Sequence, residues 1–342
     1  MATEFKQKRA ILIGVNRYEN VGHLRYCRDD AVKLGETLVS SLGFEADKIL
    51  TFVDGSSDYP PLRSKIFLNL GKMNDSKSIG EDDLLLFFFS GHGMIGKEDG
   101  KDYLLPIDAT LYNLKETAIR VEDIATELKR TGCKNIVMFI DACREDMAGA
   151  KGVASIGDNS AESAKRAGIV TFFSCNPRDK SYEIEELQHG AFTYCILDAI
   201  AKGEANTVSA LESYLRRQVP VVNARYNKPA QQPYAIIEPV GKGDLAIFFT
   251  AAQQQQVSSR RDVWLAKIGE MFNDGQIALE LFNRMVAFLV DYRDPSFEQD
   301  KRTFLIDKLY SGTLSVTAFR VAWEAHERKQ VAAPQTTLGR PT

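Results

Sequence analysis

The fold is decided by Asn135–Asp146, which reads N-I-V-M-F-I-D-A-C-R-E-D. Its five apolar residues, Ile136–Ile140, run without a break, which is typical of a strand buried on both faces of a parallel sheet. Asp141 ends the run, and Cys143 follows at the position where open parallel sheets bind their ligands. The stretch therefore predicts an α/β sheet that carries a thiol just past the carboxyl end of a buried strand.

A second stretch has the same pattern. Leu84–Phe89 (L-L-L-F-F-F) predicts another buried strand, and it runs directly into Ser90-Gly91-His92-Gly93. Two strand ends are thus expected to bring together one Cys and one His, the pair that nucleophilic thiol catalysis uses.

The rest of the first 250 residues alternates between strand and helix patterns, which predicts a mainly parallel six-stranded sheet with helices on both faces. The first helix is expected to be capped by Asp29 or Asp30 and to end near Leu42. Further helices are expected at 60–73, 121–131, 191–202 and 208–222. The other four strands are expected at 10–15, 48–53, 169–174 and 234–237, with 244–249 as an additional edge strand.

The composition predicts four segments. Residues 1–250 form an α/β domain whose halves are joined by a long polar loop at 144–168, and 251–259 is a linker. Residues 260–328 form a small all-α docking or effector domain, and 329–342 is a disordered tail. Within the helical part, Met271–Phe282 and Lys308–Phe319 repeat a Gly, an apolar residue two positions later and a Phe seven positions later, as expected if the Gly ends one helix before the next begins.

Charge and cysteine usage limit the classes of function. The formal charge of −3 gives no reason to expect nucleic-acid binding, and no apolar run approaches the ~20 residues that span a bilayer. The five scattered cysteines and the polar N-terminus predict a cytoplasmic protein without a secretory signal, a disulfide framework or a zinc site.

Cys143 follows His92 by 51 positions, close to the ~50 residues that separate the same pair in caspases. On these motifs, residues 9–249 resemble the caspase-like cysteine peptidases, and within them the metacaspase and prokaryotic caspase-like branch. Gly190–Tyr194 (G-A-F-T-Y) adds support, because it is similar to the start of a helix in the second half of that family's domain. The resemblance implies a caspase-like sandwich, and it does not extend to the C-terminal helical residues.

The resemblance implies the roles of the central residues. Cys143 would be the nucleophile of a cysteine endopeptidase and His92 its base, and the backbone N–H groups of Gly93 and Cys143 would form the oxyanion hole. The family often cuts itself between its two halves, so Lys151, Lys165 and Arg166 are candidate autocleavage sites.

The substrate's basic residue is expected to bind to acidic groups. By resemblance to metacaspases that cut after Arg or Lys, the pocket would be lined by Cys27, Asp30, Ser90 and Asp141. In an opposing interpretation Arg25 or Arg28 binds a substrate aspartate. In a third, Asp29 and Asp30 only cap a helix.

No cofactor is expected. A bound calcium ion is suggested only by the resemblance, since the candidate ligands Asp108, Glu122 and Asp123 lack the spacing of an EF-hand. The expected partners are a protein or peptide substrate and a regulatory protein recruited by the helical domain. Two alternatives stay open: a caspase-type peptidase that cuts after Asp, and a catalytically silent scaffold with a caspase fold.

Overall fold

The computed structural model describes residues 5–96, 98–143, 164–165, 168–176, 180–248, 264–265, 267–291 and 301–331. They fall into two compact units, one within residues 3–251 and the other within residues 252–342. The predicted linker at 251–259 and the loop residues 144–163 lie outside the described residues.

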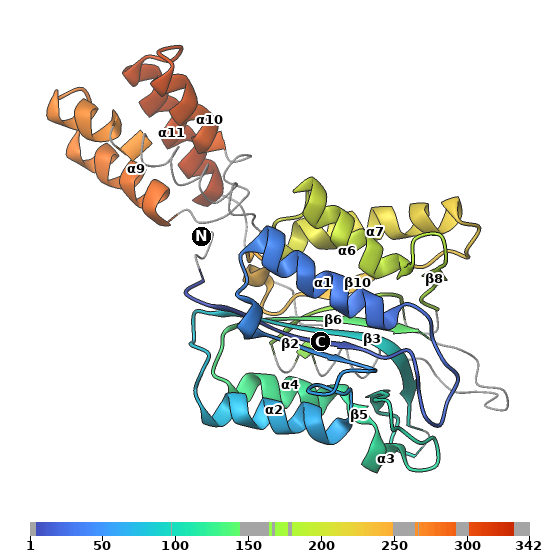
Figure 1. Ribbon diagram of the computed structural model, residues 1–342. Coiled ribbons are helices and arrows are strands. Elements are labelled where there is room, and N and C mark those ends of the chain that lie inside the picture. Colours follow the sequence, from blue (N-terminus) through green and yellow to red (C-terminus); the bar gives the residue numbers. More distant parts are fainter. Residues whose placement is uncertain are drawn as a thin grey trace, which may run out of the picture. The chain divides into compact units, whose positions relative to one another are not determined.

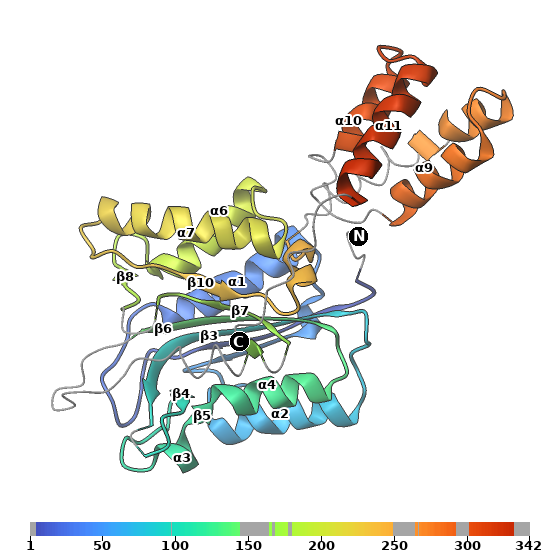
Figure 2. The ribbon, with the colours of Figure 1, turned by 180° about the vertical axis from the view of Figure 1, so that it is seen from behind.

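The first unit is a sheet with helices on both faces (Figures 1 and 2). The strand order is β10-β7-β6-β3-β1-β2, and every pair along this path is parallel except β10–β7. The predicted α/β sandwich with a mainly parallel sheet is therefore confirmed, and six of the eight strands of the sheet form this path. The strands are β1 (Lys8–Gly14), β2 (Ile49–Val53), β3 (Leu84–Ile95), β6 (Asn135–Cys143), β7 (Val170–Phe173) and β10 (Tyr234–Ile236).

One helical layer packs on each face, because successive apolar side chains of the central strands point to opposite faces of the sheet. Leu84, Leu86 and Phe88 share one core with α1 (Cys27–Leu42), α6 (Ala191–Lys202) and α7 (Val208–Arg225). Leu85, Phe87 and Phe89 point the other way, into the core formed with α2 (Arg63–Asp75) and α4 (Val121–Arg130). Figure 1 shows the two layers above and below the sheet.

Short elements complete the unit. The strands β4 (Asp102–Leu104) and β5 (Ile119–Arg120) extend the end of β3 as an antiparallel ribbon beside α3 (Leu114–Thr117). The strands β8 (Glu183–Ile184) and β9 (His189–Gly190) form a separate hairpin just before α6. The expected edge strand at 244–249 is wrong within the described residues: Val240–Asp244 is a 3-10 helix, and Ala246 makes one isolated bridge with Thr207.

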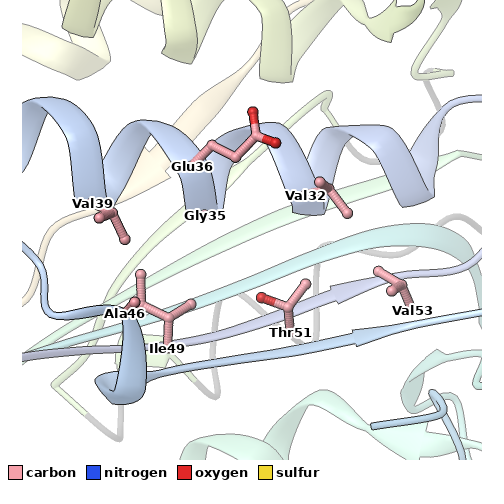
Figure 3. Close-up of a pocket in the computed structure, with 8 residues that line it drawn as sticks. All are labelled: Val32, Gly35, Glu36, Val39, Ala46, Ile49, Thr51 and Val53. Carbon is pink, nitrogen blue, oxygen red and sulfur yellow. The ribbon is translucent and has the colours of Figure 1, made fainter. Parts of the chain in front are cut away.

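At one edge of the sheet, β2 has β1 as its only neighbour along the strand order. A groove of about 600 Å³ lies between this strand and α1, lined by Val32, Gly35, Glu36, Val39, Ala46, Ile49, Thr51 and Val53 (Figure 3). Its lining is mainly aliphatic and contains no Cys or His.

The second unit is helical and has its own core around Trp264, Phe319 and Trp323. Its helices include α9 (Leu279–Asp291), α10 (Lys301–Tyr310) and α11 (Val316–Val331), the last of which ends three residues beyond the predicted helix end. Gly275 and Gly312 both have positive φ, +68° and +71°, where each precedes a new helix. The repeat thus marks two helix–glycine–helix corners. Among the described residues, none of the helices has the length and apolar character needed to cross a membrane.

Candidate active site

The backbone brings His92 and Cys143 side by side. In the parallel register of β3 and β6, His92 is the partner of Cys143, Gly91 of Ala142 and Ser90 of Asp141. Neighbouring strands lie about 4.8 Å apart, so the ladder fixes the spacing of the two residues. The sequence had predicted that both strands end before these residues, which is wrong: both run on through them. The side chain of Cys143 lies outside the described residues.

His92 is 2% exposed and is held by its neighbours from three directions. Its backbone N–H donates to the Tyr18 hydroxyl at 2.7 Å, and its carbonyl accepts from Leu105 N–H at 2.9 Å. Its Nε2 lies 2.8 Å from the Gly22 carbonyl oxygen. A carbonyl can only accept, so Nε2 carries a proton and Nδ1 is the basic nitrogen of the neutral ring.

The glycines around His92 permit close approach of the backbone. A Cβ at Gly91 would lie 2.5 Å from the Tyr18 hydroxyl and 2.9 Å from Cζ of Phe89, so only glycine fits there. Gly93, the predicted oxyanion-hole residue, pairs with Leu104 where β3 joins β4.

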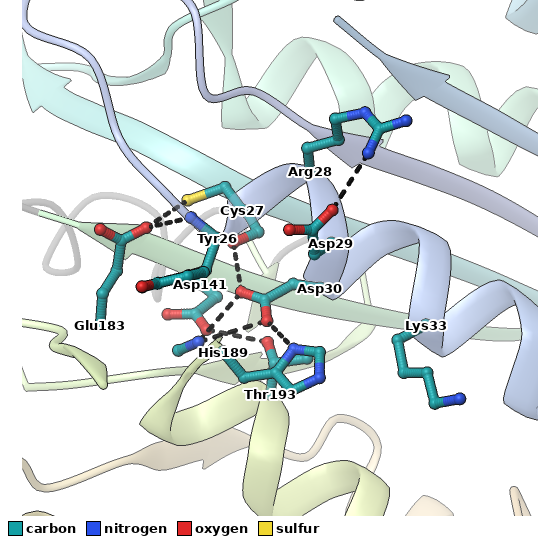
Figure 4. A network of polar contacts seen from close by, with 12 residues as sticks. Tyr26, Cys27, Arg28, Asp29, Asp30, Lys33, Asp141, Glu183, His189 and Thr193 are labelled. Carbon is teal, nitrogen blue, oxygen red and sulfur yellow. Dashed lines mark hydrogen bonds and ion pairs between the residues drawn. The ribbon is translucent and has the colours of Figure 1, made fainter. Parts of the chain in front are cut away.

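The carboxylates of Asp30 and Asp141 lie close to each other, at the start of α1 and on β6 two residues before Cys143 (Figure 4). The α1 helix reaches the strand ends because Gly14 has no side chain: a Cβ there would overlap the Cys27 carbonyl oxygen and the Ala31 Cβ. Asp30 Oδ2 accepts from Ser90 Oγ at 3.1 Å, and Asp30 Oδ1 lies 2.8 Å from His189 Nδ1.

Asp141 is fixed by two hydroxyl groups. Ser181 Oγ donates to its Oδ1 at 2.6 Å and Thr193 Oγ1 to its Oδ2 at 2.9 Å. Asp30 and Asp141 are each 1% exposed, and burial raises the pKa of both carboxyls, that of Asp30 to about 7. The two are close neighbours, since a Cβ at Gly190 would lie 3.2 Å from Asp30 Oδ2 and 2.9 Å from Asp141 Oδ2.

The four predicted pocket residues therefore belong to one cluster. Ser90 bonds to Asp30 and is the register partner of Asp141, while the Cys27 thiol lies 3.8 Å from Glu183 Oε1 beside them. The cluster is closed, however, because its carboxylates are buried and bonded to groups of the protein itself.

The interpretation of Asp29 or Asp30 as the helix cap is wrong. The N-cap of α1 is Tyr26, whose side chain makes no capping bond, and both aspartates lie in the first turn. The acceptor comes from far along the chain: the Glu183 carboxylate accepts from Tyr26 N–H at 2.7 Å and from Arg25 N–H at 3.0 Å. It supplies the negative charge that a helix N-terminus favours.

The two arginines of the opposing interpretation contact other acids. The Arg25 guanidinium pairs with Glu185 at 3.3 Å, and that of Arg28 pairs with Asp29 at 3.1 Å, both between exposed side chains. The pair formed by Asp30 and Asp141 is thus surrounded by hydroxyls, a backbone N–H and an imidazole.

Four polar residues of the cluster escaped sequence reasoning, because each makes its contact across a long stretch of chain. They are Ser181, Glu183, His189 and Thr193. The one usable signal was position: His189 directly precedes, and Thr193 belongs to, the Gly190–Tyr194 stretch already recognised as family-like.

Two of the three candidate calcium ligands are paired with basic side chains. Glu122 Oε2 is paired with Lys101 Nζ at 2.9 Å, and Asp123 Oδ2 with Arg120 Nε at 2.9 Å. A calcium ion would have to compete with these basic groups for the carboxylate oxygens of Glu122 and Asp123. No group of three candidate metal ligands occurs within the part of the chain that the structure describes.

Of the candidate autocleavage residues, Lys165 is exposed on a short helical segment, and Lys151 and Arg166 lie outside the described residues. The remaining cysteines with described side chains, Cys133, Cys175 and Cys195, are buried thiols. Burial raises the pKa of Cys133 to about 11 and that of Cys195 to about 12, which makes them poor nucleophiles.

Comparisons with known proteins identify the family of the chain. The caspase domain family model matches residues 7–262. Metacaspase-9 from Arabidopsis thaliana is 34% identical over 89 residues, which are 26% of this chain and 27% of the relative. Metacaspase-2 from the same plant is 24% identical over 237 residues, 62% of this chain and 56% of the relative.

Metacaspase-1 from Plasmodium falciparum is 31% identical over 113 residues, 30% of this chain and 18% of the relative. The chain thus spans less than half the length of several of these curated relatives. Among solved structures, caspase-1 from Spodoptera frugiperda aligns with a TM-score of 0.46 at 15% identity, covering 69% of this chain and 88% of that one. On the extent of the family match, the chain belongs to the caspase domain family.

Proposed function

We propose that this protein is a cysteine endopeptidase that cuts peptide bonds after Arg or Lys with Cys143 as nucleophile and His92 as base. The observation that carries the proposal is the parallel register that pairs His92 with Cys143 beside two buried carboxylates. Family membership supports the reaction class, because the matched region contains both residues.

In the proposed reaction, the Cys143 thiol transfers its proton to His92 Nδ1, and the thiolate attacks the scissile carbonyl carbon. The N–H groups of Gly93 and Cys143 stabilise the oxyanion that forms. The imidazolium then protonates the leaving amine, which departs and leaves a thioester on Cys143. Water, deprotonated by His92, hydrolyses that thioester. The bond from Nε2 to the Gly22 carbonyl supports this cycle, because it holds the ring in one tautomer and stabilises its charged form.

The preference for Arg or Lys follows from the charge of the cluster. Asp30 and Asp141 lie together, and Glu183 adds a third carboxylate at its edge. A substrate cation would be attracted to these groups and a substrate Asp repelled. The surface pairs made by Arg25 and Arg28 favour this choice over cleavage after Asp.

Two further parts of the proposal concern the whole chain. If basic residues are the cutting points, Lys151, Lys165 and Arg166 are the places where the chain would cut itself, and the exposure of Lys165 suits such a site. The helical unit would bring a regulatory protein or a substrate to the peptidase, in the cytoplasm.

The test is to replace Cys143 by Ala and measure cleavage of peptides that end in Arg, Lys or Asp. We expect the wild-type chain to cut after Arg and Lys, and Cys143→Ala to lose about a thousandfold or more of that activity. The matched control is Cys133→Ala, which removes a buried thiol bonded to the Asp83 carbonyl at 3.1 Å and leaves the proposed site intact.

The outcomes separate the alternatives. Cleavage after Asp alone would replace the basic specificity with the caspase-type one. If a thiol-reactive Arg-peptide probe fails to label Cys143 and no peptide is cut, the catalytically silent scaffold is the better description.

A further inference from the structure

His189 makes the shortest contact to Asp30. The ring Nδ1 lies 2.8 Å from Oδ1, and the ring comes from the β8–β9 hairpin, 159 residues further along the chain (Figure 4). The side chain of His189 is 17% exposed, whereas that of Asp30 is 1% exposed. The imidazole is therefore the partner of this contact that solvent can reach.

The hydrogen bonds of Asp30 are fully used. A carboxylate has about four lone-pair positions. Oδ1 faces His189 Nδ1 and Gly190 N–H, and Oδ2 faces Ser90 Oγ and the same N–H, at 2.8 to 3.3 Å. A guanidinium or ammonium group from a substrate cannot bind to Asp30 unless one donor leaves. Gly190 N is backbone and Ser90 is 1% exposed, whereas the side chain of His189 is 17% exposed, so His189 is the donor with access to solvent into which it can rotate.

The hairpin around His189 is anchored independently of that ring. Glu183, in β8, binds the backbone N–H groups of Arg25 and Tyr26 at the start of α1, and Glu183 is the register partner of Gly190. The ring can thus leave Asp30 while the hairpin stays docked. The charged groups around Asp30 are Asp141 from β6, Glu183 from β8 and His189 itself. Departure of the ring would leave a strongly acidic site.

We propose that His189 occupies the specificity site in the resting enzyme as an internal substitute for the substrate's basic residue, and that Arg or Lys must displace it from Asp30 to bind. This inference rests on the proposed basic specificity. It adds that His189 competes with the substrate's Arg or Lys for Asp30. His189 is a specificity-determining residue: it weakens the binding of every substrate, and only a cation able to replace its hydrogen bond is admitted.

The first test compares His189→Ala and His189→Asn with wild type in steady-state cleavage of an Arg peptide. Because the bond to His189 lowers the pKa of Asp30, the assays are run at pH 9 so that Asp30 is ionised in each protein. We expect KM to fall about tenfold in His189→Ala, the effect of one hydrogen bond to a charged group. His189→Asn retains an uncharged donor near the Nδ1 position, and its KM should lie between the other two. The effect should fall on KM rather than kcat, because the ring has left before chemistry begins.

An unchanged KM in His189→Ala would overturn the inference. So would a higher KM in His189→Ala that His189→Asn returns to the wild-type value. In that case the ring would support Asp30 rather than compete for it.

The second test does not depend on variants of His189 being folded. The chain has four histidines, so ring ¹⁵N signals of Cys143→Ala can be followed by NMR while agmatine, a free aliphatic guanidinium, is added. We expect the Nδ1 signal of His189 to move as its bond to Asp30 is lost, and the signals of His92 to move less. If agmatine binds near Asp30 and leaves the His189 signal in place, this inference is wrong, while the proposed basic specificity stands. Agmatine that shifts no signal would remove the basic specificity and this inference together.

Discussion

Asp30 is buried at a position where the proposed reaction needs it ionised. Its carboxyl is 1% exposed, and burial is the largest cause that raises its pKa from 3.8 to about 7. The bonds from His189 and Ser90 lower the pKa again, and Asp141 raises it. Binding of a substrate cation would add an opposite charge in contact with Asp30 and so favour its ionised form.

The raised pKa predicts how stability depends on pH. A carboxyl whose folded-state pKa lies above its unfolded value stabilises the protein fully below the unfolded pKa, and this contribution is lost as pH rises through the folded one. For Asp30 the window is from about pH 4 to about pH 7. As pH rises across that window, the free energy of unfolding in urea should fall by a few kcal/mol more for wild type than for Asp30→Asn.

Asp29→Asn is the matched control, because Asp29 is the adjacent residue with an exposed side chain paired to Arg28. Its pH profile should run parallel to that of wild type. Parallel profiles for Asp30→Asn as well would show that the Asp30 carboxyl is not the group that titrates.

Single residues differ in how far the sequence reveals them. His92 and Cys143 could be named in advance, because each follows a long apolar run and their spacing resembles a known family. The role of His189 could not be predicted, since its contact with Asp30 spans 159 residues and its place before Gly190–Tyr194 does not reveal that contact. The prediction of the helix cap was wrong for the same reason: the acceptor is Glu183, which lies 157 residues from Tyr26.

At the scale of elements, types and order could be predicted well and the ends less so. The helix at 191–202 agrees to the residue with α6, where Gly203 in a left-handed conformation ends it. The ends of β3 and β6 were placed too early because hydrophobicity stops at Phe89 and Ile140. Their hydrogen bonds continue, since each strand is the other's partner as far as His92 and Cys143. The hydrophobic pattern therefore cannot predict where a strand with polar residues at its end stops.

The docking of the β8–β9 hairpin on α1 can be tested at Glu183. Replacing Glu183 by Ala leaves the Arg25 and Tyr26 N–H groups without this acceptor, so the free energy of unfolding should fall by about 1 kcal/mol, as for loss of a helix cap. Glu185→Ala is the control on the same hairpin, because Glu185 makes only an exposed pair with Arg25. Urea denaturation measures both. Equal effects of the two substitutions would contradict the capping role.

For the whole molecule, the cores divide as the two units do. The two clusters on the faces of the sheet contain described residues from 5 to 248, and the third contains residues from 264 to 323. None of the three clusters draws residues from both units. The stability of the α/β unit should therefore not depend on the helical one.

A chain that ends at Ala251 should accordingly unfold within about 3 °C of the α/β transition of the full chain, which is about the shift that roughly 1 kcal/mol produces in a domain of this size. Differential scanning calorimetry of both proteins gives the comparison. A much lower transition in the shortened chain would mean that the helical unit supports the sheet.

The continuous pairing of β3 with β6 has a consequence for how this protein can vary. His92 and Cys143 are aligned by rungs of backbone hydrogen bonds that begin at Leu84 and Asn135, so their alignment is inherited from the sheet and not from the intervening chain. The exposed residues between Leu105 and Val121 can therefore change in number, provided that Leu104 and Leu105 stay paired with the end of β3 and α4 stays packed on the sheet. The number of residues between the two motifs can thus vary, whereas the pairing of His92 with Cys143 in the β3–β6 register must be kept.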